Sequence, residues 1–402
     1  MSIDYDLLIV GGGLAGNCLA LALKDCGLHL AIVEANTQEQ LRSSPAGDRA
    51  LALAAGTVAV LEQLEVWQGV KQQASAIKQI HISDRGHFGK TRLSASREKV
   101  DALGYVITAR AIETHVANQV QQARIDVICP ARVTGLISGP DAVHANLKQG
   151  DDSFNVSAKL LVGADGGQSS IRKLLDIGQH LSDYDQTALV TTVKSQLPNN
   201  HTAYERFTIS GPLALLPVGS HHSAVVWTRS TDDAQALMAG NDADFLAELQ
   251  DCFGYRLGEL AMTEPKRAFP LTLIRAEKML SGRAVIIGNA AHQLHPVAGQ
   301  GFNLGLRDVV QLAEMLITQH ESGGDIGDTG FLNRYAQARQ QDHDKTIFFT
   351  DQVVRIFSND WFAMAAARNF GLLLLDHIPA AKAFLARHAM GLAEHLPKPA
   401  KR

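Results

Sequence analysis

The 402-residue sequence predicts an α/β fold: a discontinuous Rossmann-like nucleotide-binding domain with an inserted mixed β-sheet domain and a C-terminal helical region. Three observations predict it. A glycine turn joins an apolar strand to a helix near the N-terminus, and a second glycine-rich turn follows a strand near residue 288. Between them, residues 185–275 alternate apolar and polar side chains as strands do. The two turns belong to one domain only if the strand-rich region is inserted between them.

The N-terminal segment carries a dinucleotide fingerprint. Residues 5–10 and 29–35 predict strands and 17–26 a helix, with the turn Gly11-x-Gly13-x-x-Gly16 after the first strand. Gly11 permits the tight turn, Gly13 the approach of a pyrophosphate, and Gly16 close packing of helix on strand. Glu34, 23 residues after Gly11, suits ribose hydroxyls. This pattern does not separate NAD from FAD. The residues expected to contact the cofactor here are Gly11, Gly13, Leu14, Ala15, Gly16, Glu34 and Ala35.

The second glycine-rich segment predicts where the reactive ring of a cofactor lies. A strand over 283–287 leads to Asn289, which is placed to bond a ribitol hydroxyl, and a helix begins near Asn303. The N–H groups of the loop and the positive end of that helix favour the charge of a reduced flavin. Two distant nucleotide-binding turns indicate one long cofactor, and the obvious candidate is FAD. The residues expected against it are Gly288, Asn289, Gly299, Gln300, Gly301, Phe302 and Asn303.

Two further segments leave alternatives open. Asp165 and Gly166 follow a strand and predict another backbone approach to the nucleotide, with Arg172 fixing the loop through Asp165; the alternative is a plain helix N-cap. Arg49 could contact the cofactor phosphates or the flavin edge, or form a surface salt bridge. A zinc site at His292 and His295 lacks a third ligand, so we expect no metal.

Composition excludes several function classes. The net charge is −4 and no basic block is present, so we expect no nucleic-acid partner. The N-terminus lacks a secretory signal and no apolar run reaches the length of a membrane span. The four cysteines have no metal spacing, which is typical of reduced thiols in a cytoplasmic protein. The apolar segment 370–393 fits either a helix pair that docks on lipid or a partner, or a buried packing helix.

The domain boundaries follow from these segments. We expect an FAD-binding domain over 1–73, 102–178 and 280–345, a substrate domain over 74–101 and 179–279, and a helical region over 346–402. Within them, 51–73 and 109–123 predict helices, 77–93 a hairpin, and 131–162 short strands. A crevice between the first two domains is the natural substrate site. Aromatic and methionine side chains of 200–275 could line it, although ordinary core packing is commoner: Tyr204, Phe207, Trp227 and Met262.

In their order and spacing, the three glycine segments resemble those of class A flavoprotein monooxygenases, which have the fold of para-hydroxybenzoate hydroxylase. Within that class the chain resembles the ubiquinone-biosynthesis hydroxylases, through the run His295–Asp308 and through segments 48–68, 81–89 and 205–217. The resemblance covers essentially the whole chain. The broader family has aspartate where this chain has Asn289; the amide keeps an acceptor oxygen, so ribitol bonding survives without a carboxylate.

The resemblance implies a reaction in two halves, in which NADH or NADPH reduces FAD and O₂ then gives a C4a-hydroperoxide that hydroxylates an activated ring. The implied conversion is 2-polyprenyl-6-methoxyphenol to 2-polyprenyl-6-methoxy-1,4-benzoquinol. A sister hydroxylase acting elsewhere on the ring, or a non-catalytic flavoprotein of the biosynthetic complex, are the alternatives. No second dinucleotide fingerprint appears, so we expect a pyridine nucleotide to bind only transiently, and a different electron donor is the alternative.

The resemblance also implies site residues and partners. Pro296 and Gln300 lie next to the flavin by family analogy, and Tyr204 is a candidate catalytic partner on the phenol. Expected partners are the lipid substrate, O₂ and other ubiquinone-biosynthesis proteins. The expected location is the cytoplasm, with peripheral contact to the inner membrane through the C-terminal region or membership of a lipid-binding complex.

Overall fold

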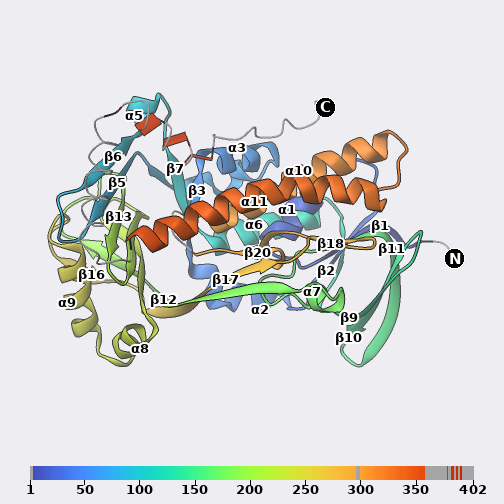
Figure 1. Ribbon diagram of the computed structural model, residues 1–402, viewed down its shortest axis with the longest axis horizontal. Helices are drawn as coiled ribbons and strands as arrows, with labels where there is room; N and C mark the ends of the chain where they lie inside the picture. The colour runs from blue at the N-terminus through green and yellow to red at the C-terminus, as the bar shows by residue number, and fades with distance from the viewer. Residues whose placement is uncertain are drawn as a thin grey trace.

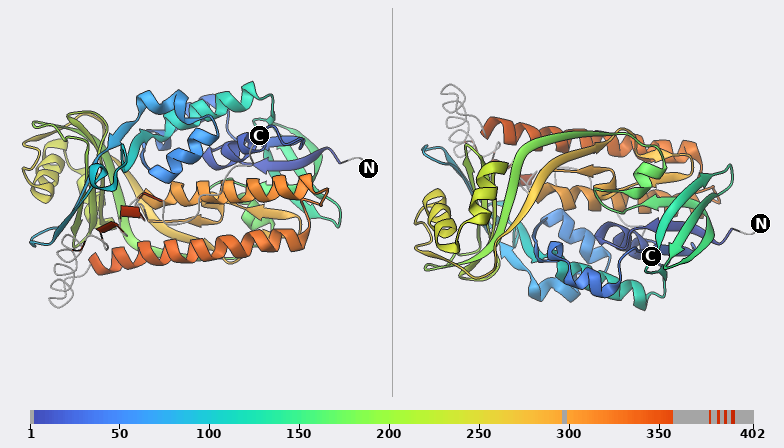
Figure 2. Two further views of the ribbon diagram at one scale, coloured as in Figure 1. Left: turned by 90° about the horizontal axis from the view of Figure 1, so that it is seen from above. Right: turned by 90° about the horizontal axis from the view of Figure 1, so that it is seen from below.

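The computed structural model describes residues 3–295, 299–357 and seven positions between 378 and 391. Two large sheets lie end to end along the molecule, and the helix α11 (Thr329–Phe357) runs along both of them (Figure 1). Helices pack side by side against the first sheet, and a pair of helices covers the far side of the second sheet (Figure 2). This arrangement confirms the predicted α/β fold with a second, mixed sheet.

The first sheet is mostly parallel and buried. Its eight strands run in the order β18-β19-β11-β1-β2-β8, with β10 and β9 added beside β11. Strands buried on both faces need near-continuous apolar sequence, which β1 (YDLLIV) and β2 (LAIV) provide. The strands are β1 (Tyr5–Val10), β2 (Leu30–Val33), β8 (Asp126–Ile128), β9 (Arg132–Ser138), β10 (Val143–Gln149), β11 (Asp152–Gly163), β18 (Leu280–Ser281) and β19 (Ala284–Ile286). The packed helices are α1 (Leu14–Ala22), α6 (Ala109–Gln122) and α10 (Gln300–Glu321).

The strand order explains how distant glycine segments meet. The central strands β19, β11 and β1 are parallel neighbours, and Val10 pairs with Gly163, which in turn pairs with Ile286. Each of these strands ends where one glycine segment begins. In an open parallel sheet, ligands bind outside the carboxyl ends of the strands. The three segments therefore share one edge of the sheet.

The second sheet has nine strands in the order β20-β17-β12-β15-β14-β13-β5-β6, with β16 beside β12. The hairpin of residues 79–94 adds to the edge of this sheet, beside β13, as its alternating pattern predicted. The strands are β5 (Gln79–Asp84), β6 (Lys90–Ser94), β12 (Gln179–Ser195), β13 (Thr202–Thr208), β14 (Gly211–Pro217), β15 (His222–Ser230), β16 (Leu260–Met262), β17 (Arg267–Ala276) and β20 (His292–Gln293).

Three sequence predictions were wrong in part. Residues 50–54 begin no helix but form the strand β3 (Ala50–Ala54), because pairing with β7 (Gly104–Thr108) overrides the helix propensity of alanine and leucine. The region 185–275 is not only strands: α8 (Thr231–Ala239) and α9 (Asp242–Phe253) start at side-chain caps from Ser230 and Asn241. The last described helix, α11, begins at Thr329, well before residue 345.

The remaining elements connect the two sheets. A small sheet of β3, β7 and β4 (Ser75–Ile77) lies between them, and α3 (Ala55–Gln63) and α4 (Trp67–Val70) follow it. Short helices are α2 (Gln38–Ser43), α5 (Ala95–Glu98) and α7 (Ser170–Leu174). No helix within the described ranges has the length and hydrophobicity to cross a bilayer. Most of the predicted docking segment 370–393 lies outside the described residues.

Candidate active site

The N-terminal glycine turn is tightly packed at Gly16, where α1 approaches the turn, and has open space at Gly13. A Cβ atom added at Gly16 would lie 2.0 Å from the carbonyl oxygen of Gly11, so only glycine allows this helix-to-strand contact. A Cβ added at Gly13, the N-cap of α1, would meet nothing within 4 Å. Space in front of a helix N-terminus, next to free N–H groups of Leu14 and Ala15, suits a phosphate group.

Glu34 is fixed at the end of β2 beside the same turn. Its carboxylate accepts hydrogen bonds from the backbone N–H groups of Gly12 and Asn36, each at 2.7 Å. The next residue, Ala35, is partly exposed. The Glu34 carboxylate is therefore held in place next to the glycine turn.

A buried arginine links two glycine segments. The second segment follows β11 at Gly163, and the third follows β19 and begins at Gly288. The guanidinium of Arg172, 2% exposed, donates to the carbonyl oxygens of Gly167 at 2.8 Å and Ala290 at 2.7 Å. Arg172 thus holds this loop as expected, but through backbone carbonyl groups, and the charge of Asp165 acts on it without a direct hydrogen bond between the two side chains. Asp165 instead caps α7 by accepting from the backbone N–H groups of Ser170 and Ile171, which is the alternative that the sequence left open.

The third segment combines open space with a clamped loop. Asn289 is exposed beside Gly288, and a Cβ added at Gly301 would meet nothing within 4 Å. The Asn303 side chain clamps the loop: its amide donates to Gly299 O at 2.7 Å, and its oxygen accepts from Ala54 N at 3.1 Å. The Asn303 side chain therefore binds the loop to β3.

Other predicted residues of this loop are placed as follows. Gln300 is buried at the first turn of α10, and Phe302 is partly buried against the main core. Gly166 has open space in front of it, at a φ of +84°. Pro296 lies outside the described residues.

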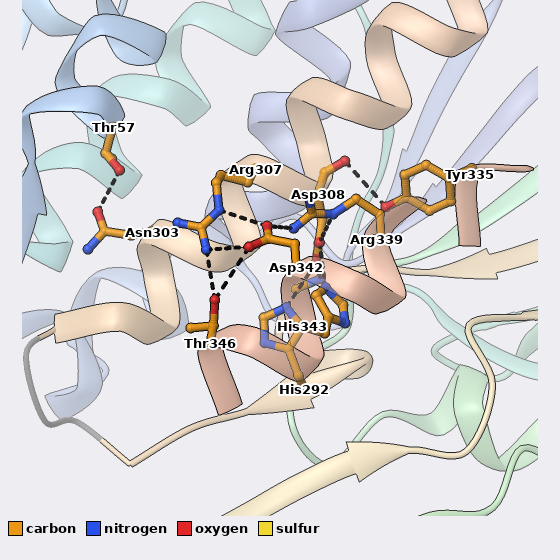
Figure 3. A network of polar contacts seen from close by, with 11 residues as sticks. Thr57, His292, Asn303, Arg307, Asp308, Tyr335, Arg339, Asp342, His343 and Thr346 are labelled. Carbon is orange, nitrogen blue, oxygen red and sulfur yellow. Dashed lines mark hydrogen bonds and ion pairs between the residues drawn. The ribbon is translucent and has the colours of Figure 1, made fainter. Parts of the chain in front are cut away.

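A buried polar network behind the third segment was missed by the sequence analysis. Asp308, fully buried on α10, accepts from Gly288 N at 3.1 Å and from His292 Nε2 at 2.8 Å (Figure 3). From α11 it also accepts from Arg339 Nε and His343 Nε2, both at 2.7 Å. These neighbours hold the pKa of the Asp308 carboxyl well below its usual range, although its burial acts the other way. The carboxylate thus fixes the backbone N–H of Gly288, next to Asn289.

The same network contains three residues that could in principle bind a metal ion. His292, Asp308 and His343 bring three ligand atoms within 4.8 Å of one another. The Asp308 carboxylate already accepts four hydrogen bonds, one of them from the cationic Arg339, which uses its acceptor sites and opposes a second cation. His295, the other predicted candidate, packs edge-on against Tyr184 with ring centroids 5.3 Å apart. The chemistry of this cluster is that of a hydrogen-bonded support.

Residues at the start of β3 contact the strand β17 of the second sheet. Asp48 makes ion pairs with Arg110 at 2.6 Å and with Arg267 of β17 at 2.8 Å. The Arg49 guanidinium lies 5.8 Å from the ring centroid of Phe269, also on β17. The salt bridge expected at this position is therefore made by Asp48, whereas Arg49 packs across the boundary between the sheets.

Tyr204 points to the opposite face of that sheet. Its ring packs edge-on against Phe253 of α9 at 5.4 Å, in a core cluster that includes Leu213 and Trp227. This placement gives Tyr204 a packing environment against α9. A surface hollow of about 600 Å³ beside α11, lined by Leu273, Arg275 and Phe348 among others, contains none of the predicted cofactor residues.

The open glycines, the held carboxylate and the helix N-termini of α1 and α10 fit a dinucleotide with a flavin at the third segment. A protein-family model described as "FAD binding domain" matches residues 4–349. The ubiquinone hydroxylase UbiL of Rhodospirillum rubrum is 34% identical over 400 residues, covering 98% of this chain and 91% of that protein. The chain belongs to the FAD-dependent monooxygenases, in the ubiquinone hydroxylase group.

Other relatives agree with this assignment. A 3-demethoxyubiquinol 3-hydroxylase of Escherichia coli is 28% identical over 389 residues, covering 96% of this chain and 98% of that protein. Among solved structures, p-nitrophenol 4-monooxygenase from Pseudomonas putida superposes with a TM-score of 0.80 at 17% identity, over 98% of this chain and all of that one. The anhydrotetracycline hydroxylase OxyS from Streptomyces rimosus gives 0.74 at 22% identity, over 99% and 78%. These structural likenesses establish the fold.

Proposed function

We propose that this FAD-dependent monooxygenase hydroxylates the ring of a polyprenyl phenol in ubiquinone biosynthesis. The finer assignment is hydroxylation of the ring carbon para to the phenol oxygen, called C1 below, from 2-polyprenyl-6-methoxyphenol to 2-polyprenyl-6-methoxy-1,4-benzoquinol, as in 2-octaprenyl-6-methoxyphenol hydroxylase. The observation that carries the proposal is the match to a ubiquinone hydroxylase over 98% of the chain, which includes all three cofactor segments.

Different residues of the chain bind different parts of the cofactor. The turn at Gly13 and the N-terminus of α1 bind the pyrophosphate, Glu34 binds the ribose, and the loop Gly299–Gly301 orients the flavin ring. When bound, FAD supplies the electrons and the activated oxygen for ring hydroxylation. An apolar face of the second sheet excludes water from the predicted crevice. NADH or NADPH is the proposed reductant, and its binding is transient.

A second candidate is hydroxylation at another ring position. The specific observation in its favour is the E. coli 3-demethoxyubiquinol 3-hydroxylase, which matches 96% of this chain. A non-catalytic role in the biosynthetic complex, with docking through the C-terminal segment, is a third. The proposed division into an FAD-binding domain (1–73, 102–178, 280–345) and a substrate domain (74–101, 179–279) applies to all three.

Quinone-lipid mass spectrometry of a strain lacking this gene separates the candidates. Accumulation of the polyprenyl methoxyphenol with loss of ubiquinone in aerobic growth supports C1 hydroxylation. A later ring intermediate assigns the protein to another position. Complementation by wild type but not by Gly13→Val distinguishes catalysis from a scaffold role, since a scaffold needs no bound flavin.

A further inference from the structure

The inner face of the second sheet is defined by its strand register. Side chains alternate between the two faces of a sheet. Leu213 and Trp227 face α8 and α9, as does Tyr204, so their neighbours along each strand face the other way. Glu205 pairs with Ile82 on one side and Ala214 on the other. Continuing across the sheet, the inner row consists of Ile82, Glu205, Ala214, Val226, Val190 and Arg267.

This inner face looks toward the cofactor side of the molecule. Ala203, two residues before Glu205 on the same face, packs in a cluster with Ile77 of β4 and Val106 of β7. At the other end of the row, Arg267 pairs with Asp48, which directly precedes Arg49 and β3. The flavin loop contacts the same small sheet, since a Cβ added at Gly299 would lie 3.0 Å from the Cβ of Ala52. The inner row and the flavin loop therefore flank one small sheet.

Every side chain of the inner row is partly exposed, although its strands lie inside the molecule. Next to this row, on the same face, Ala203, Phe207 and Ala224 are buried. Other side chains of this face, Ile80, Thr192 and Leu216, are partly exposed as well. The neighbouring elements therefore leave the inner face partly uncovered. The inner row is apolar from Ile82 to Val190 except for Glu205, which is its one acidic member.

Glu205 has no hydrogen bond or ion pair with any residue that the structure describes. Its neighbours across the strands, Ile82 and Ala214, are apolar, and the charged member of the row, Arg267, lies four strands away and pairs with Asp48. Burial raises the pKa of the Glu205 carboxyl to about 7, and no charged group contributes to the shift. An unpaired carboxyl in apolar surroundings is unfavourable for folding. Its position on this partly uncovered face is explained if a ligand supplies the partner.

We propose that the Glu205 carboxylate is the group that binds the phenol hydroxyl of the substrate and accepts its proton. This inference rests on the proposed function. In the step, the phenolic O–H bond breaks, its electron pair stays on the phenol oxygen, and the proton passes to a carboxylate oxygen of Glu205. The negative charge moves from the carboxylate to the phenolate, whose ring carbons are then more nucleophilic toward oxygen.

The environment of Glu205 suits this role. A phenol has a pKa near 10, about 5.5 units above an ordinary glutamate and about 3 above a carboxyl near 7. A smaller difference between the pKa values of phenol and carboxyl makes the free energy of proton transfer less unfavourable. Enzymes adapt carboxylates to general-base catalysis in this way. Tyr204, the residue expected from the sequence, is adjacent but faces α9.

The test compares two probes bound to the FAD-loaded enzyme: 2-methoxy-6-prenylphenol and its O-methyl ether, which lacks the donor. Binding is followed by the absorbance change of the oxidised flavin, so no turnover is needed. In the wild type we expect the phenol to bind roughly tenfold or more tightly than the ether above about pH 7. The preference falls as the pH drops below about 7, because the carboxylate becomes protonated.

Glu205→Gln removes the negative charge and keeps the shape, so we expect phenol and ether to bind about equally at every pH. It also removes the rise of kcat/KM for phenol hydroxylation with pH, whereas Glu205→Asp retains part of that rise. The matched control is Glu259→Gln, an exposed glutamate of the same sheet domain, which leaves the preference unchanged. An unchanged preference in Glu205→Gln overturns the inference.

Two outcomes distinguish a failure of the Glu205 assignment from a failure of the proposed function. If the wild type neither binds nor hydroxylates any prenylated phenol, the proposed function is wrong. If it hydroxylates the phenol but its preference for phenol over ether is constant from about pH 6 to about pH 8, the function stands and the assignment of Glu205 is wrong. The second comparison uses the wild type only, so it decides even where Glu205→Gln fails to fold.

Discussion

Replacing Asp308 by asparagine tests whether the buried network supports the flavin loop. Asp308 accepts four hydrogen bonds with no exposed surface, two of them from side chains of α11. Removing one partner of a buried ion pair costs about 3–5 kcal/mol. The lower value applies because Arg339 keeps its ion pair with Asp342. With an unfolding entropy of roughly 2.1 cal/mol/K per residue, about 3 kcal/mol over 402 residues lowers Tm by about 4 °C.

Differential scanning calorimetry of the FAD-loaded protein measures this shift, and flavin fluorescence titration measures the accompanying loss of FAD affinity through Gly288. Asp141→Asn is the matched control, because Asp141 is exposed and its loss changes stability by less than about 0.5 kcal/mol. If Asp308→Asn melts within about 1 °C of the wild type and binds FAD equally well, the network does not support the loop.

Three further predictions concern other residues. Gly13→Val reduces FAD affinity in a fluorescence titration, while the stability of the apoprotein stays near wild type because the new side chain meets open space. Gly16→Ala lowers the stability, because its Cβ would lie 2.0 Å from a backbone oxygen. Equal stability of the two variants contradicts this prediction. Arg172→Met loses two charge-assisted hydrogen bonds and lowers the unfolding free energy by about 3 kcal/mol in urea titrations, whereas a loss below about 1 kcal/mol contradicts the link between segments. Burial lowers the pKa of His81 and His295 to about 4, so both bind protons on unfolding between about pH 4 and pH 6.5, and stability falls as the pH drops from about 7 to about 5. Changing both histidines to glutamine flattens that decline, and an unchanged slope refutes it.

The sequence predicted the fold and the cofactor segments because both depend on local patterns. The turn of Gly11 to Gly16 is identified by its own strand and helix, and the loop at Gly299 by the helix that it opens. That β1, β11 and β19 are adjacent follows from the topology of the whole sheet, which no local pattern contains.

The links between segments could not be predicted for the same reason. Arg172 bonds Ala290, 118 positions later, and Asp308 bonds His343 of a helix whose start was expected too late. Alternation along β13 does place Tyr204 and Glu205 on opposite faces. Which face is left partly uncovered depends on α8 and α9, and these helices were absent from the predicted strand region.

The most direct measurement incubates the purified, FAD-loaded protein with NADH, 2-methoxy-6-prenylphenol and ¹⁸O₂, and identifies the product by mass spectrometry. The proposed hydroxylation predicts a prenylated methoxybenzoquinol, or its quinone, that carries one ¹⁸O atom on the ring carbon para to the original phenol oxygen. Incorporation at another carbon assigns the enzyme to a different ring position. The proposal of a phenol hydroxylase is contradicted if NADH is oxidised but only hydrogen peroxide is formed. The same must hold with NADPH as the reductant, and a polyprenyl substrate must also remain unmodified.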